Sequence, residues 1–267
     1  MQCFLRDEVN GIICTLGGWN ANDVLPLLDY QAIAEHPKVF VGFSDITALH
    51  CALLARAGIV TFHGPSLLPT FGEAGGPAPF TVEWFMRAVS EQAPLGVIAD
   101  PGEFTDELLW WETEDTRPRK YTPAVGLRCV VPGRAEGRLF GGNLATLITL
   151  VGTEYFPPTD GAILLLEDEE GTTAQTERDL QCLQLHGALD GIRGIIFGRP
   201  YRYHTVSPQR TLEQILSEIG YALHIPVMTD VACSHTDPML TLPLGVQASL
   251  DAENGELCIE ETAVISI

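Results

Sequence analysis

The sequence predicts an α/β fold in two parts. Short apolar runs alternate with amphipathic helical stretches up to residue 92, a pattern typical of a parallel, doubly wound sheet. Gly- and Pro-rich segments dominate residues 93–132, and α/β patterning resumes at Gly133 and ends in β-rich sequence. We therefore expect an N-terminal domain over residues 1–92, a linker with a loop insertion over 93–132, and a C-terminal α/β domain over 133–267.

The composition supports a packed globular protein. The chain has 267 residues, of which 46% are hydrophobic, and this is enough to build a sizeable core. No apolar run approaches the roughly 20 residues that span a bilayer. The first ten residues have neither the basic lead nor the apolar core of a signal peptide, so the sequence predicts a cytoplasmic protein.

Charge and cysteine usage exclude several classes of function. The formal net charge is −20, which repels phosphate backbones and anionic lipid and predicts no nucleic-acid or membrane partner. The seven cysteines are scattered and include no Cys-x-x-Cys pair. A disulfide framework and a zinc ribbon are therefore not indicated.

The elements of the N-terminal part follow from periodicity and from Gly and Pro positions. A buried strand at residues 11–15 runs into Gly17-Gly18, which either lets a backbone N–H approach a ligand or is an ordinary turn. The further expected elements are helices at 22–30 and 30–36, a strand at 39–43, a helix from Ile46 to Gly58, a strand at 59–62 and a helix at 81–90.

The C-terminal part continues the alternation and then changes to β-structure. Asn254-Gly255 is a type I′ hairpin signal between two strands. The expected elements are helices at 144–151, 174–186 and 211–219, and strands at 162–166, 194–197, 226–229, 246–251 and 257–261.

Ser44 stands at the predicted turn between a strand and a helix. A hydroxyl there projects from the carboxyl edge of a sheet beside the free N–H groups of a helix, where an oxyanion can be stabilised. Ser44 is therefore a candidate nucleophile. The alternative is that Ser44 and Asp45 only cap the helix. Ile46 replaces the second glycine of the Gly-x-Ser-x-Gly elbow, which argues against an α/β-hydrolase esterase.

A serine nucleophile needs a base and a third group that orients the base. His63 and His235 both follow predicted strands, and the residues leave both open as the base. Glu167 comes directly after the buried strand 162–166 and is the candidate third group, whereas Asp168–Glu170 fit a solvated turn. Trp110 and Trp111 lie in a polar loop and suit a lid, an interface, stacking on a planar ligand, or packing within their own domain.

Four motifs in this order along nearly the whole chain resemble the LD-carboxypeptidase family of serine peptidases, which includes muramoyltetrapeptide carboxypeptidases. Further matches, around Trp111 to Asn143 and at Cys233-Ser-His-Thr-Asp-Pro-Met239, are most similar to the microcin C self-immunity branch of that family. The four motifs are Gly42-Phe-Ser-Asp-Ile-Thr47, Gly141-Gly-Asn143, Leu165-Leu-Glu-Asp168 and His235-Thr-Asp-Pro-Met-Leu-Thr-Leu-Pro-Leu-Gly245.

The resemblance implies a Ser44–His235–Glu167 triad with an oxyanion hole from the N–H groups of Asp45 and Gly18. It also implies a flavodoxin-like (class I glutamine amidotransferase-like) N-terminal domain, a site between the two domains, a homodimer, and no metal or cofactor. Gly17, Trp110, Trp111 and Asn143 are the implied substrate contacts. Arg134, Arg138 and Arg178 all remain candidates for binding a substrate carboxylate.

The resemblance leaves two substrate classes open, a small LD-muropeptide and an aminoacyl-nucleotide. The paired tryptophans favour the second, because that branch stacks an aromatic residue on the base. The microcin-immunity branch also has a lysine soon after the catalytic glutamate, and residues 167–172 contain none. Family members begin with a strand–helix–strand segment before the Gly-Gly turn. This chain starts later, so the alternative expectation is an incomplete N-terminal domain in a non-catalytic binding protein.

Overall fold

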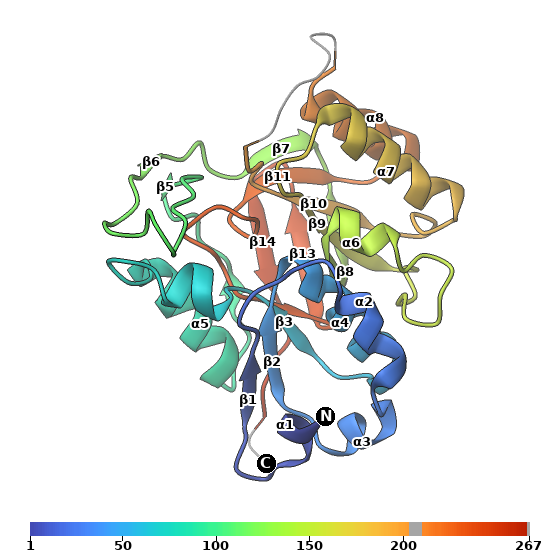
Figure 1. Ribbon diagram of the computed structural model, residues 1–267. Coiled ribbons are helices and arrows are strands. Elements are labelled where there is room, and N and C mark those ends of the chain that lie inside the picture. The colour runs from blue at the N-terminus through green and yellow to red at the C-terminus, as the bar shows by residue number, and fades with distance from the viewer. Residues whose placement is uncertain (203–209, 266–267) are drawn as a thin grey trace.

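The computed structural model describes residues 1–202 and 210–265 and contains two main sheets (Figure 1). The smaller sheet has the strand order β1-β2-β3-β12, with β1 (Gly11–Ile13), β2 (Val39–Gly42), β3 (Thr61–His63) and β12 (Leu242–Leu244). The first three strands are parallel, and β12 pairs antiparallel to β3.

Short helices flank this sheet. Asp29 caps α3 by accepting a hydrogen bond from the Ala32 N–H, and Gly58 ends the Ser44 helix in the left-handed conformation, as expected for a helix C-terminus. The helical segments of this part are α1 (Gln2–Leu5), α2 (Ala21–Val24), η1 (Leu25–Leu27), α3 (Tyr30–Glu35), η2 (Ser44–Ile46), α4 (Thr47–Ala52), η3 (Leu53–Ala57), η4 (Leu67–Phe71) and α5 (Pro79–Ser90).

The larger sheet has eight strands in the order β4-β14-β13-β8-β9-β10-β11-β7. Its centre, β8 to β11, is parallel, and the flanking pairs are antiparallel. The strands are β4 (Gly96–Val97), β7 (Arg128–Val131), β8 (Arg134–Asn143), β9 (Ala162–Glu167), β10 (Gly194–Gly198), β11 (Val227–Val231), β13 (Gln247–Asp251) and β14 (Glu256–Ile259).

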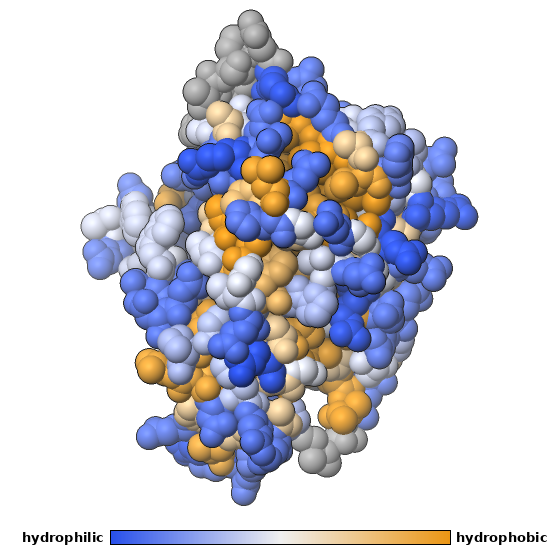
Figure 2. Space-filling view, turned by 90° about the vertical axis from the view of Figure 1, so that its right-hand side faces the viewer, coloured by the Kyte–Doolittle hydropathy of each residue, from blue (hydrophilic) through white to orange (hydrophobic). Residues whose placement is uncertain are grey.

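Strand β9 is buried on both faces, which explains its unbroken apolar sequence. Leu164 and Leu166 pack into one hydrophobic cluster, and Ile163 and Leu165 pack into the other. The helices α6 (Leu144–Ile148), α7 (Thr173–Leu185) and α8 (Leu212–Leu223) lie together on one side of the molecule (Figure 1). On the face shown in Figure 2, hydrophobic residues reach the surface among hydrophilic ones.

The expected mixed α/β class is confirmed, and the expected elements occur close to their expected bounds. No strand was expected at β8, the longest strand of the larger sheet. The expected division into domains stays a prediction, and the strand pairing shows how the expected parts are connected. The segment expected to be a linker contributes β4 and β7 to the larger sheet, whereas β12, from the expected C-terminal domain, completes the smaller one. Local sequence does not reveal these pairings, because each strand is short and its partner is distant.

The hairpin between β13 and β14 is present, but the predicted type I′ turn is wrong. Four residues, 252–255, connect the paired Asp251 and Glu256, and of the Asn-Gly pair only Gly255 has a positive φ. A type I′ turn requires positive φ at both central residues. Within the described part of the chain, no helix is long and apolar enough to cross a membrane.

Candidate active site

Ser44 occupies a strained turn directly after β2. Phe43 is extended, and Ser44 has φ = 63°, the left-handed region that side-chain-bearing residues rarely adopt. The turn is crowded, since a Cβ on Gly17 would lie 3.0 Å from the Ser44 Cβ. The backbone after β1 therefore packs directly against Ser44, and only glycine fits there without displacement.

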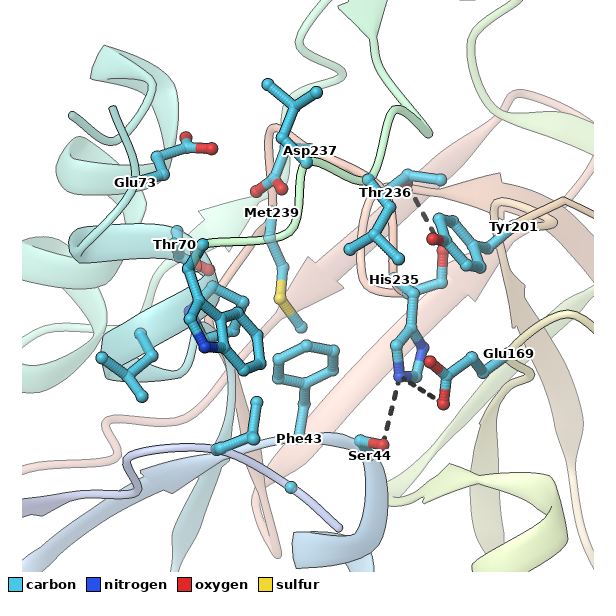
Figure 3. Close-up of a pocket in the computed structure, with 18 of the residues that line it drawn as sticks. Phe43, Ser44, Thr70, Glu73, Glu169, Tyr201, His235, Thr236, Asp237 and Met239 are labelled. Carbon is cyan, nitrogen blue, oxygen red and sulfur yellow. Dashed lines mark hydrogen bonds and ion pairs between the residues drawn. The ribbon is translucent and has the colours of Figure 1, made fainter. Parts of the chain in front are cut away.

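The residues predicted to act with Ser44 lie beside it in one hydrogen-bonded row. The His235 Nε2 is 3.1 Å from the Ser44 Oγ, and the Nδ1 is 2.8 Å from the Glu167 Oε2. Glu167 ends β9 and is fully buried, and His235 follows β11 in the segment that leads to β12. Figure 3 shows the His235 ring pointing at the Ser44 hydroxyl. Nucleophile and base thus come from different sheets.

The electrostatics of this row fix the imidazole tautomer. Burial would raise the pKa of Glu167, but His235 outweighs it, and the pKa lies below its usual value. Burial would likewise lower the pKa of His235, but the Glu167 carboxylate raises it above its usual value. An ionised Glu167 accepts the Nδ1–H, so the Nε2 of neutral His235 is free to accept the Ser44 proton.

His63, the other candidate base, has a structural role. It ends β3 and is fully buried, with its Nε2 2.6 Å from the carbonyl oxygen of Cys233. Burial lowers the pKa of His63 below its usual value, so the neutral ring donates to that carbonyl. His63 therefore holds the segment that carries His235 against the smaller sheet.

The turn at Gly17-Gly18 lies next to the helix that follows Ser44. The Asp45 carboxylate accepts a hydrogen bond from the Ala21 N–H at 2.9 Å and so connects the two turns. Gly18 has φ = 146°. The expected oxyanion hole from the N–H groups of Asp45 and Gly18 stays a prediction.

A cavity of about 310 Å³ opens beside Ser44 and His235. Gly17, Gly18, Trp110 and Trp111 all line it. The expected contacts of Gly17 and the two tryptophans with substrate stay predictions. Both tryptophans come from the loop between β5 (Glu103–Phe104) and β6 (Thr122–Pro123), and each exposes about half of its surface. A planar ligand at the mouth of the cavity can therefore reach an aromatic face.

Asn143 does not line the cavity. It is buried at the end of β8, pairs in register with Glu167, and accepts a hydrogen bond from the Thr146 N–H at the start of α6. Its side chain also helps to lower the pKa of Glu167. In this structure Asn143 therefore favours the ionised form of Glu167. Its expected contact with substrate stays a prediction.

None of the three candidate arginines lines the cavity. Arg134 pairs with Asp251 and Arg178 pairs with Asp179, while Arg138 lies on β8 opposite Gln247. The arginine that does line it is Arg119, which contacts Glu73 at 2.5 Å and Asp237 at 2.6 Å. Sequence reasoning missed Arg119 because it lies in an irregular loop. The available signal was the run Arg117-Pro-Arg-Lys120, which gathers three cations in a chain of net charge −20.

A buried Glu–His pair facing a serine hydroxyl in a cavity is an arrangement that serine hydrolases use. The sequence profile of the LD-carboxypeptidase N-terminal domain matches residues 1–64, and that of the C-terminal domain matches residues 136–250. The chain belongs to the LD-carboxypeptidase family and is a serine carboxypeptidase, as the sequence motifs predicted.

Two curated relatives represent the two branches. The microcin C7 self-immunity protein MccF of Escherichia coli is 37% identical over 95% of this chain and 74% of its own length. The probable murein peptide carboxypeptidase of Bacillus subtilis is 31% identical over 99% of this chain and 74% of its own length.

Solved structures match over nearly the whole chain. MccF in complex with aspartyl sulfamoyl adenosine has a TM-score of 0.90 at 36% identity, covering 99% of this chain and 79% of the other. A muramoyltetrapeptide carboxypeptidase from Oxalobacter formigenes has a TM-score of 0.79 at 26% identity, covering 99% and 82%.

Proposed function

We propose that this chain hydrolyses the amide bond of a small aminoacyl-nucleotide, with Ser44 as nucleophile, His235 as general base and Glu167 as the group that orients it. The observation that carries the proposal is the continuous row from the Glu167 carboxylate through both nitrogens of His235 to the Ser44 hydroxyl. A serine at neutral pH needs both a base and an orienting group to attack a carbonyl.

The proposed reaction has two stages. The Ser44 oxygen attacks the substrate carbonyl while its proton moves to the His235 Nε2, and the N–H groups of Asp45 and Gly18 bind the oxyanion. The imidazolium then donates that proton to the leaving nitrogen as the C–N bond breaks. Water, deprotonated by His235, hydrolyses the acyl-serine and restores Ser44.

The substrate class rests on the tryptophans at the mouth of the cavity. Trp110 and Trp111 line the cavity that contains Ser44 and remain partly exposed, and an aromatic face stacks well on a nucleobase. MccF structures have been solved with aspartyl sulfamoyl adenosine and with glutamyl sulfamoyl guanosine. A second candidate is a small LD-muropeptide, which the murein peptide carboxypeptidase relative favours.

The test is mass spectrometry of the products after incubation with an aminoacyl-sulfamoyl adenosine and, separately, with an LD-tetrapeptide. We expect the wild type to release the free amino acid from the nucleotide, and Ser44→Ala to lose on the order of 10⁶ in rate. Trp110→Ala with Trp111→Ala should raise KM for the nucleotide and leave any peptide hydrolysis unchanged.

Unchanged turnover by Ser44→Ala would overturn the assignment of the nucleophile. Binding of either substrate without turnover by the wild type would support the alternative, a non-catalytic binding protein. Trapping an acyl-enzyme at Ser44 would exclude that alternative. The expected homodimer stays a prediction that light scattering can test.

A further inference from the structure

Glu169 lies at the reacting end of the cavity. Its Oε2 is 3.4 Å from the same His235 Nε2 that faces Ser44. In Figure 3, dashed lines join the same nitrogen of the His235 ring to the Glu169 carboxylate and to the Ser44 hydroxyl. Glu169 lines the cavity, and about half of its side chain is exposed. It therefore contributes a negative charge beside the carbonyl that Ser44 would attack.

The other described carboxylates of the cavity wall have partners within the protein. Glu73 and Asp237 both contact Arg119, and Glu107 pairs with Arg117. Asp115 accepts hydrogen bonds from the Ala74 N–H. Glu169 has His235 as its neighbour, and that ring is neutral when it acts as the base. Among these carboxylates, Glu169 is the one placed to bind a cation of the substrate.

We propose that Glu169 binds the free α-ammonium group of the substrate, so that the enzyme selects aminoacyl compounds over peptides acylated at that nitrogen. This inference rests on the proposed function. In an aminoacyl amide the α-nitrogen is one carbon away from the scissile carbonyl, and when Ser44 attacks, it lies within reach of the Glu169 carboxylate. A charged hydrogen bond of this kind is stronger than a neutral one.

The same charge disfavours the competing substrate class. Within a muropeptide the nitrogen at the L-centre is part of a peptide bond, so it carries no charge and has one N–H. Such a substrate would leave Glu169 partly desolvated without a cation, which is costly for a carboxylate. Glu169 thus discriminates between the two substrate classes, because it attracts the ammonium group of an aminoacyl compound and disfavours binding of an uncharged muropeptide nitrogen.

The experiment compares kcat/KM for one aminoacyl-sulfamoyl adenosine with a free α-amine and for its N-acetyl derivative. For the wild type we expect a preference of roughly 10- to 100-fold for the free amine, the size of one hydrogen bond to a charged group. Glu169→Gln should reduce that preference to within about threefold. Glu170→Gln is the matched control, because Glu170 pairs with Arg202 and does not line the cavity.

Calorimetry in the Ser44→Ala background measures the same preference without turnover. Loss of the preference on adding Glu169→Gln would support the role of Glu169 even if the wild type hydrolysed neither compound, and only the proposed function would then fail. Equal binding of the two compounds by Ser44→Ala would overturn the inference. So would an equal fall in kcat/KM for both compounds in Glu169→Gln, because Glu169 would then act through His235 alone.

Discussion

The conformation of Ser44 explains how a common residue type becomes a candidate nucleophile. Ser44 has φ = 63°, and in this conformation its hydroxyl lies 3.1 Å from the His235 Nε2. A residue with a Cβ in this region costs on the order of 1 kcal/mol, whereas glycine adopts it freely. The stability of the surrounding fold compensates for this cost.

This strain predicts an order of stability among variants that lack the hydroxyl. Ser44→Gly should melt above Ser44→Ala, because both lose the contact with His235 and only glycine relieves the strain. Relief of about 1–2 kcal/mol, less the roughly 0.4–1 kcal/mol that glycine adds to the unfolded-chain entropy, leaves a gap of up to about 1.6 kcal/mol. Each 1 kcal/mol of that gap corresponds to roughly 2–4 °C by differential scanning calorimetry. An alanine variant at least as stable as the glycine variant would contradict this account.

At the scale of residues, sequence reasoning found those candidate site residues that stand next to a strand predictable from the sequence. Ser44, Glu167 and His235 each lie at or after the end of a recognisable strand, and the carboxyl ends of strands are where sites form. The choice between His63 and His235 needed the family resemblance, because the sequence places both after predicted strands. Arg119 and Glu169 were missed as site residues because the sequence does not show where a loop folds back.

At the scale of elements, the loop between β5 and β6 is held against the segment that contains His235. Thr105 and Asp237 exchange backbone hydrogen bonds of 2.7 and 3.0 Å. Arg119, from the same loop, bridges Asp237 and Glu73. The loop that presents Trp110 and Trp111 is therefore fixed, through Asp237, to a point two residues from His235.

Removing Arg119 should destabilise the protein in a pH-dependent way. Burial already raises the pKa values of Glu73 and Asp237 above their usual values, and Arg119 opposes this. In Arg119→Gln both pKa values rise further, and charged carboxylates are left unpaired in the folded state. Breaking such a pair costs about 3 kcal/mol. Because a carboxyl with a raised folded-state pKa destabilises only when ionised, the loss should be largest near pH 8 and shrink toward pH 5.

Urea denaturation at several pH values measures this effect. Arg117→Gln is the matched control, because Arg117 lies in the same loop and pairs with Glu107 at the surface, where ion pairs contribute little. A loss of stability that is constant with pH would mean that Arg119 acts by packing rather than by charge. Hydrogen exchange of the loop should also increase in Arg119→Gln.

Most regular elements were predictable because periodicity and capping are local. Thr211 and Gln214, for example, form the capping box that starts α8. The short strands β4, β7 and β12 were not predicted, since two to four residues carry too little pattern and only their distant partners define them. The turn between β13 and β14 shows the same limit. Its four-residue connection differs from the two-residue type I′ turn that Asn-Gly favours locally.

At the scale of the whole molecule, the chain crosses between the sheets more often than two separate domains would require. Strand β12 joins the smaller sheet after the chain has built most of the larger one. Between the two sheets, His63 donates a hydrogen bond to the Cys233 carbonyl, and Ser44 contacts His235. The smaller sheet is incomplete without β12, and the candidate site does not exist unless both parts fold together.

This interlocking predicts one cooperative unfolding transition for the chain. Far-UV circular dichroism, tryptophan fluorescence and loss of activity should share one urea midpoint. Leu242→Ala, which removes a fully buried side chain from β12, should cost about 2–5 kcal/mol and lower that midpoint for every probe together. Leu185→Ala, at an exposed position at the end of α7, should leave it unchanged. If Leu242→Ala instead separated the probes, with residues 1–92 unfolding first, the two parts would be independent domains, as the sequence alone suggests.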